Sequence, residues 1–170
     1  MRRVLLALTT FVPLTVLAQH FALETQSDSL HFLLLHTGDA TDRWCLPYPV
    51  YRLDSADIDG NGITDAVVGV VKRTRFMPDV ERRIFVFKNH KGLIRPLWMG
   101  SRLGGHLQDF RCVGRLVRAL ETSDSGVYVV ADYAYDGFGL SFVRYHLRGG
   151  TEAEARRIFL TPQPTDNPTN

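Results

Sequence analysis

The sequence contains none of the short motifs by which many hydrolases and nucleotide-binding enzymes are recognised. It has no G-x-S-x-G elbow, no H-E-x-x-H pair and no P-loop. Six histidines are present, but none pairs with a cysteine or glutamate at a zinc-ligand spacing, which argues against a zinc site. Distant segments can still assemble a catalytic site, so an enzyme is not excluded, but the sequence favours a non-catalytic protein.

Cysteine is also scarce. Cys45 and Cys112 are the two cysteines, so at most one disulfide can form within the chain. The sequence leaves two alternatives open, a bridge between them or two buried free thiols. No cysteine directly follows the apolar segment at the N-terminus, which argues against a lipid anchor there.

Long apolar runs are absent except at the N-terminus. There, Arg2 and Arg3 precede the run Val4 to Leu17, and Ala18 completes a small-residue pattern typical of a cleavage site. We therefore predict a signal peptide over residues 1–18, with cleavage exposing Gln19. The exported protein would be periplasmic or extracellular, with no stable membrane span after removal of the signal. A retained signal anchor is the alternative.

The mature chain has no excess of charge of either sign. Loss of Arg2 and Arg3 leaves 18 basic residues against 18 acidic ones. A balanced charge gives no electrostatic reason to expect a nucleic-acid partner, and an exported protein is a poor candidate for one.

A sustained helical apolar period is missing as well. Short apolar segments alternate with glycine-bearing turns, which predicts an antiparallel all-β domain of successive hairpins over residues 19–160, as a small barrel, a sandwich or a partial propeller-like sheet. We expect a short C-terminal helix over residues 151–157 and a disordered tail over residues 161–170. The expected strands include residues 31–36, 66–71, 83–88, 93–98, 110–113, 115–120, 127–133 and 138–146.

The most informative segment is a polar, glycine-rich loop over residues 57–65. Oxygen-bearing side chains recur at alternate positions, and calcium takes six to eight such ligands. Gly60 and Gly62 allow the positive φ angles of a tight curl. The predicted calcium ligands are the side chains of Asp57, Asp59, Asn61 and Asp65 and the backbone carbonyl of Ile63.

The loop is not an EF-hand, because Val68 stands where that motif requires a bidentate glutamate. A D-x-D-x-N-G-x-x-D loop followed by a V-V-G-V strand resembles the calcium loop of FG-GAP repeats, the blades of integrin-type β-propellers. The resemblance covers about residues 51–72 and implies that Asp57, Asp59, Asn61 and Asp65 bind calcium. The chain has no second copy, whereas a propeller usually needs at least four blades. A hairpin turn in which Asp and Asn cap their own backbone is the alternative.

Three functions follow from these observations. The first is an exported calcium-binding β domain in which Ca²⁺ is structural and a surface binds an unknown protein or glycan of the envelope. The aromatic residues Trp98, Tyr135 and Phe138 are candidates for that surface. The second is an envelope polysaccharide hydrolase that uses Asp132 or Asp136 as an acid. The third is a structural domain without a metal.

Overall fold

The computed structural model describes residues 19–38, 40–75, 77–100 and 102–162. The predicted signal peptide and residues 163–170 of the predicted tail lie outside these residues. The described residues form three antiparallel sheets that follow one another along the chain, and one short helix. The all-β prediction is therefore confirmed, and the sheets do not close into a barrel.

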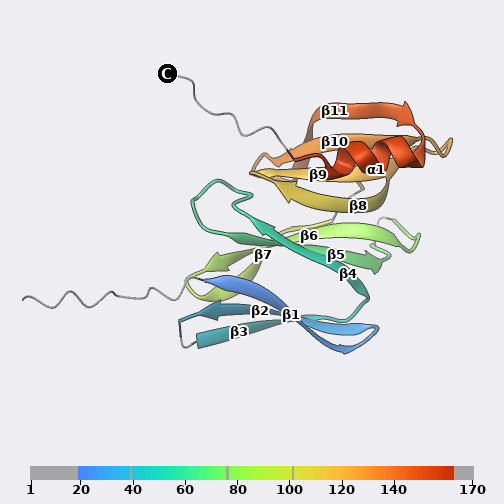
Figure 1. Cartoon of the computed structure of the whole chain (residues 1–170). Helices are drawn as coiled ribbons and strands as arrows, with labels where there is room; N and C mark the ends of the chain where they lie inside the picture. Colours follow the sequence, from blue (N-terminus) through green and yellow to red (C-terminus); the bar gives the residue numbers. More distant parts are fainter. Residues whose placement is uncertain (1–18, 39, 76, 101, 163–170) are drawn as a thin grey trace, which may run out of the picture.

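The three sheets form successive layers, with the second sheet in the middle (Figure 1). Hairpins join neighbouring strands in each sheet, so strand order in space follows order in sequence. The first sheet contains β1 (His20–Ser27), β2 (Leu30–Thr37) and β3 (Ala40–Leu46). The second contains β4 (Val50–Ala56), β5 (Asp65–Lys72), β6 (Glu81–His90) and β7 (Leu93–Met99). The third contains β8 (His106–Val113), β9 (Leu116–Thr122), β10 (Tyr128–Tyr135) and β11 (Leu140–Gly150), and α1 (Glu152–Leu160) follows it.

The middle sheet is buried on both faces, which explains the continuous apolar run in β5. Successive side chains of a strand point to opposite faces. Accordingly, Val67 packs in a core shared with the third sheet, whereas Val68 and Val70 pack in a second core shared with the first sheet. A strand covered on both faces needs apolar residues at every position rather than at alternate ones.

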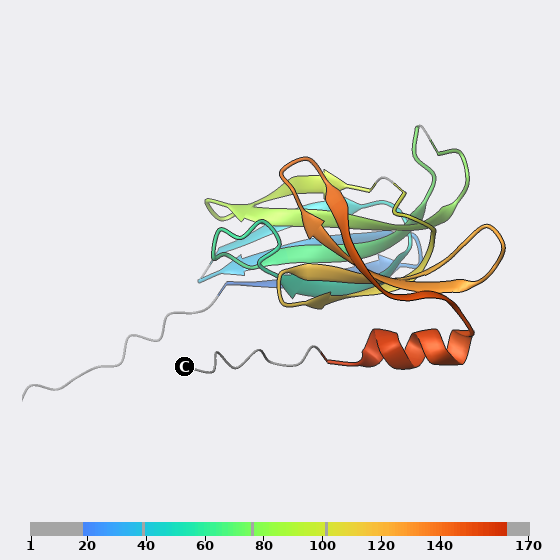
Figure 2. The same cartoon turned by 90° about the horizontal axis from the view of Figure 1, so that it is seen from above.

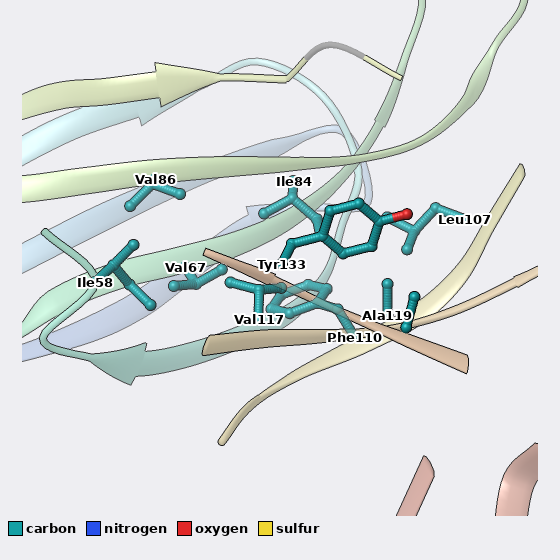
Figure 3. Packing of buried hydrophobic residues seen from close by; sticks show 10 residues of the cluster. Ile58, Val67, Ile84, Val86, Leu107, Phe110, Val117, Ala119 and Tyr133 are labelled. Carbon is teal, nitrogen blue, oxygen red and sulfur yellow. The ribbon is translucent and has the colours of Figure 1, made fainter. Parts of the chain in front are cut away.

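The core between the second and third sheets contains side chains from both layers (Figure 3). Ile84 and Val86 of β6 face Phe110 of β8 and Tyr133 of β10 across this space. Ile58, which belongs to the loop between β4 and β5, is part of the same cluster and lies beside Val67 in Figure 3. The polar loop therefore has one apolar anchor in the core.

Helix α1 covers the opposite face of the third sheet (Figures 1 and 2). Ala155 and Phe159 pack against Leu120 and Val130. The side chain of Thr151 accepts a hydrogen bond from the backbone of Glu154 at 3.3 Å and caps the helix N-terminus. The helix extends three residues beyond the predicted 151–157 segment and starts one residue later.

Two arginines of the third sheet hold the C-terminal end of α1. Arg111 donates to the carbonyl of Leu160 at 2.9 Å, and Arg118 donates to the carbonyl of Thr161 at 2.9 Å. Terminal carbonyls of a helix lack partners within the helix, and cations near them are favourable. Thr161, the first residue of the predicted tail, is thus the cap of the helix.

The first sheet contains two strands that we did not predict. The segment expected as the first strand, residues 31–36, is β2, and it lies at the centre of a sheet between β1 and β3. Both flanking strands contain several charged and polar residues, so their apolar pattern is weak. Pairing with the strongly apolar β2 fixes them as strands.

The two cysteines are free and lie in different layers. Cys45 is on β3 of the first sheet and is exposed, whereas Cys112 is on β8 of the third sheet and is partly buried. The middle sheet separates these layers (Figure 1), so a bridge within one chain would need the fold to rearrange. Among the described residues, no helix is long and apolar enough to cross a membrane.

Candidate metal centre

The candidate centre lies in the connection between β4 and β5 of the middle sheet. Ala56, the last residue of β4, pairs with Asp65, the first residue of β5, so the intervening residues form a closed loop. Gly60 and Gly62 have φ angles of 75° and 82°, as their predicted role in the curl requires. The strand pair therefore fixes both ends of the loop.

Three carboxylates of this loop converge. One oxygen from each of Asp57, Asp59 and Asp65 lies within 4.8 Å of the others. Oxygens bound at about 2.4 Å to one calcium ion are at most about 4.8 Å apart. Asp65 is fully buried and the other two are half-buried. The cluster could thus hold a metal ion.

Backbone hydrogen bonds fix the direction of each carboxylate. Asp65 Oδ2 accepts from the backbone N–H groups of Ile58 at 2.9 Å and Asp59 at 3.3 Å. Asp59 Oδ1 accepts from Asn61 N at 3.2 Å, and Asp57 Oδ2 accepts from Gly62 N at 3.1 Å. These bonds occupy one oxygen of each carboxylate and leave the second oxygen available.

Two of the remaining oxygens are buried and have no hydrogen-bond donor among the described residues. They are Asp57 Oδ1 and Asp65 Oδ1. An unpaired buried oxygen of an ionised carboxylate is costly, so such atoms are rare in folded proteins. A cation that both oxygens coordinated would supply the partner that each of them lacks. This observation favours a metal site over a turn that merely caps its own backbone.

The electrostatics of the loop point the same way. The pKa of Asp65 is raised from 3.8 to about 6, chiefly by burial and also by the charges of Asp59 and Asp57, although the hydrogen bonds from Ile58 and Asp59 oppose the rise. Without a cation, the three negative charges repel one another. With one, the same three charges become its ligands.

The other two predicted ligands belong to the same loop. The side-chain oxygen of Asn61 accepts a hydrogen bond from the backbone N–H of Ile63 at 2.7 Å. The Ile63 side chain is exposed, and we expect this residue to contribute its backbone carbonyl oxygen as a metal ligand. The structure brings together the three carboxylates, and the ligand roles of Asn61 and Ile63 stay predictions.

The loop also contacts other layers, which the sequence did not reveal. Gly60 is packed so closely by the Arg115 guanidinium that a side chain at this position would collide with it. Tyr135 packs against the core cluster that contains Ile58 of the loop. Burial raises the pKa of Tyr135, as do the negative charges of Asp59, Asp136 and Asp65. An apolar residue between two aspartates, Ile58, was the one available signal of a loop anchored in a core.

The two acids considered for a hydrolase, Asp132 and Asp136, are each held by hydrogen bonds from neighbouring residues. Asp132 is fully buried and accepts from Arg118, Arg144 and His146 at 2.6–3.0 Å. Burial opposes its ionisation, but the hydrogen bonds from Arg118 and His146 and the charges of these two residues together outweigh that effect and lower the pKa of Asp132. A hydrolase needs one carboxyl that stays protonated, and Asp132 does not have that property.

Asp136 is held in a turn in a similar way. Its carboxylate accepts hydrogen bonds from Ser141 and from the backbone of Phe138 and Gly139 at 3.0 Å. These bonds lower its pKa to about 2. Its position matches that of a residue that stabilises a turn.

Comparisons with protein-family models, with curated proteins and with solved structures found no match to this chain. Its function must therefore be inferred from the chemistry of its own residues.

Proposed function

We propose that this chain is an exported calcium-binding β domain with a non-catalytic binding or assembly role. The observation that carries the proposal is the pair of buried oxygens, Asp57 Oδ1 and Asp65 Oδ1, that have no donor within an acidic loop. In this proposal the ion is structural.

Calcium suits this ligand set better than other metals. The predicted ligands are three carboxylates, one amide oxygen and one backbone carbonyl, which are all hard oxygen donors. Magnesium prefers a smaller octahedral shell and keeps several waters, whereas calcium accepts irregular shells of six to eight oxygens. Extracellular calcium modules function with Kd values of about 10⁻⁴–10⁻³ M, so even a weak loop would be filled. The resemblance to FG-GAP loops supports the same metal.

The ion would act by fixing the loop against two layers. It would neutralise Asp65 at the start of β5 and hold Asp57 and Asp59 toward it. These two aspartates flank Ile58, which is 2 % exposed and packs in the core shared with the third sheet. Order in the loop would therefore be transmitted to the contact between the second and third sheets.

The binding surface in this proposal lies on the third sheet near its outer edge. β11 is an edge strand, and Phe142 and Tyr145 on it are about half exposed. Phe138, in the turn before β11, is 94 % exposed. Exposed aromatic rings are typical of protein and carbohydrate contacts, so the proposed partner is a protein or a glycan of the envelope.

Calorimetric titration of residues 19–170 with calcium, together with melting curves, tests the metal. At about 10 mM calcium and the Kd range above, binding would stabilise the fold by about 1.4–2.7 kcal/mol. The melting temperature should rise by about 3–10 °C and fall again with chelator. Asp57→Ala and Asp59→Ala should abolish the rise. Asp28→Ala, at an exposed turn outside the loop, should retain it.

A melting temperature that is the same with calcium and with chelator would reject the metal. The loop would then be a hydrogen-bonded turn, and the protein a structural domain.

A further inference from the structure

A second site of a different kind lies at the third sheet. A pocket of about 300 Å³ is lined by residues of β9, β10 and β11, by the connection between β9 and β10, and by the segment that connects β7 to β8. This volume is at the lower end of the range for small-molecule sites. None of the residues of the candidate metal loop lines it. Its chemistry can therefore be considered independently of calcium.

The carboxylate of Glu121 is the buried charge of this pocket. Glu121 is only 1 % exposed. Its Oε1 accepts from the backbone N–H of Gly105 at 2.7 Å, and its Oε2 accepts from the hydroxyl of Tyr133 at 2.8 Å. Both donors are neutral, and the described part of the chain shows no ion pair to Glu121. A carboxylate offers about four acceptor positions, so about two remain.

The backbone around this carboxylate is built for close approach. A side chain at Gly104 would place its Cβ 2.9 Å from the Tyr133 hydroxyl oxygen, and one at Gly105 would place its Cβ 2.6 Å from the Thr122 carbonyl. The Gly104 N–H also donates to the Tyr133 hydroxyl at 3.1 Å. Two adjacent glycines thus let the backbone hold both Tyr133 and Glu121. The carboxylate is fixed in place rather than mobile.

A charge of opposite sign lines the same pocket. Arg148 of β11 is exposed, and its guanidinium lies 5.4 Å from the centre of the Tyr145 ring. No ion pair joins Arg148 to Glu121 among the described residues. Val127, Val129 and Tyr145 provide apolar wall between the polar groups. The pocket therefore has an acid and a base that do not neutralise each other, together with an apolar wall.

We propose that this pocket binds a small zwitterion, an amine that also carries a carboxylate on an apolar or aromatic body. Its ammonium group pairs with the buried Glu121 carboxylate and so supplies the cationic partner that this carboxylate lacks among the described residues. Its carboxylate pairs with the Arg148 guanidinium, whose fork matches a carboxylate well. A cation alone would be repelled by Arg148, and an anion alone by Glu121.

Calorimetry with three matched probes tests this proposal. The probes are para-aminomethylbenzoate, which has both charges, benzylamine, which lacks the carboxylate, and para-methylbenzoate, which lacks the amine. The first should bind the wild-type protein at least about tenfold more tightly than either of the others. Each of the other probes lacks one hydrogen bond to a charged group, and the loss of such a bond weakens binding by about tenfold or more. Equal affinity for all three, or no binding of the zwitterion, would overturn the proposal.

Substitutions test which group of the ligand each of the two charged residues binds. Glu121→Gln should weaken para-aminomethylbenzoate and benzylamine by about tenfold or more, whereas para-methylbenzoate should bind no more weakly, because its repulsion by Glu121 is removed. Arg148→Ala, at an exposed position, should weaken the zwitterion and leave benzylamine no weaker. Val127→Trp should block the pocket without touching either charge, because Val127 is 45 % exposed on its wall.

Folding and calcium binding are followed separately in each variant by the melting curve with and without calcium. If Glu121→Gln fails to fold, the other two variants still decide the matter. Binding of the zwitterion that survives both Arg148→Ala and Val127→Trp would show that this pocket is not the site. These results do not depend on whether the loop of residues 57–65 binds a metal.

Discussion

The backbone N–H of Ile58 donates to Asp65 Oδ2 at 2.9 Å, while Asp65 Oδ1 is buried and receives no hydrogen bond from the part of the chain that the structure describes. Ile58 thus ties the loop to the core through its side chain. Its backbone N–H also holds the Asp65 carboxylate in the position where the second oxygen lacks a partner. If the loop binds a metal ion, this relationship would link the stability of the fold to occupancy of the loop.

Asp65→Asn should separate the two effects of this carboxylate. The asparagine oxygen can accept the same bonds from Ile58 and Asp59, and the change removes the buried negative charge. In chelator, we expect a melting temperature equal to or above that of the wild type, because repulsion and burial of charge are relieved. In calcium, we expect the stabilisation to be lost. Asp28→Asn, outside the loop, serves as the matched control.

A lower melting temperature for Asp65→Asn in chelator, by several degrees, would mean that the charge is stabilising without an ion. The metal interpretation of the unpaired oxygen would then fail, since some other group would have to be its partner.

The calcium response should depend on pH in a defined direction. Burial raises the pKa of Asp65 from 3.8 to about 6. A carboxyl whose pKa is raised by folding favours the folded state in its protonated form, and that contribution is lost as pH rises from about 4 to about 6. Calcium needs the ionised form, so protons compete with it below about pH 6. We expect a larger calcium-induced rise in melting temperature at about pH 7.5 than at about pH 5.

The measurement compares melting curves with calcium and with chelator at both pH values. Asp65→Asn provides the reference, because it has no carboxyl to titrate at this position. A calcium response that is equal at the two pH values would show that Asp65 is not a ligand.

The two isoleucines of the loop provide a matched pair for its anchoring. Ile58 is 2 % exposed in the core, whereas Ile63 is 42 % exposed. Ile58→Ala should destabilise the fold by about 2–5 kcal/mol, as for other buried large-to-small changes. Ile63→Ala should change the free energy of unfolding by no more than about 0.5 kcal/mol. Because Ile63 is expected to act through its backbone carbonyl, its alanine variant should keep the calcium response.

Denaturant unfolding of both variants provides these values. Similar costs for the two substitutions would show that the loop is not held by Ile58, and that its order does not reach the contact between the sheets.

The thiols should differ in reactivity. Cys45 is exposed on the outer layer, whereas burial and the charge of Asp54 raise the pKa of Cys112 well above its usual range. The thiolate is the reactive form, so Cys112 should resist alkylation in the folded protein. Mass spectrometry after alkylation should show one modified cysteine in the native protein and two after unfolding. A peptide pair linked by a Cys45–Cys112 disulfide would contradict the layered fold.

The strand pattern could be predicted from sequence, but the layering could not. Hairpins over residues 83–98 and 110–120 have local signals, namely apolar alternation and glycine turns, and β6 to β9 confirm them. Burial on both faces of β5 depends on which sheets stack, which no local pattern specifies. The weakly apolar β1 and β3 were missed because their pairing with β2, rather than their own composition, makes them strands.

The functional residues were also only partly predictable from the sequence. Alternate oxygen-bearing residues in one loop are a local signal, so convergence of Asp57, Asp59 and Asp65 could be foreseen. The burial of Glu121 and Asp132 could not be foreseen, because the sequence does not distinguish a buried acidic residue from an exposed one. Their burial depends on partners such as Tyr133 and Arg118 that lie 12 and 14 residues away.

The last prediction concerns the surface proposed to bind a partner. Phe138 is 94 % exposed, so Phe138→Ser removes apolar surface without opening the core, and the melting temperature should change by no more than a degree or two. Tyr135 is partly buried, and its hydroxyl donates to the Gly137 carbonyl at 3.0 Å, so Tyr135→Phe tests that turn bond alone. If the aromatic turn contacts a partner, Phe138→Ser should weaken capture of envelope protein or glycan about tenfold, as for a central aromatic contact, while the calcium response is kept. Unchanged capture by Phe138→Ser would remove this turn from the binding surface, and cleavage of envelope glycan by the wild-type protein would favour a hydrolase instead.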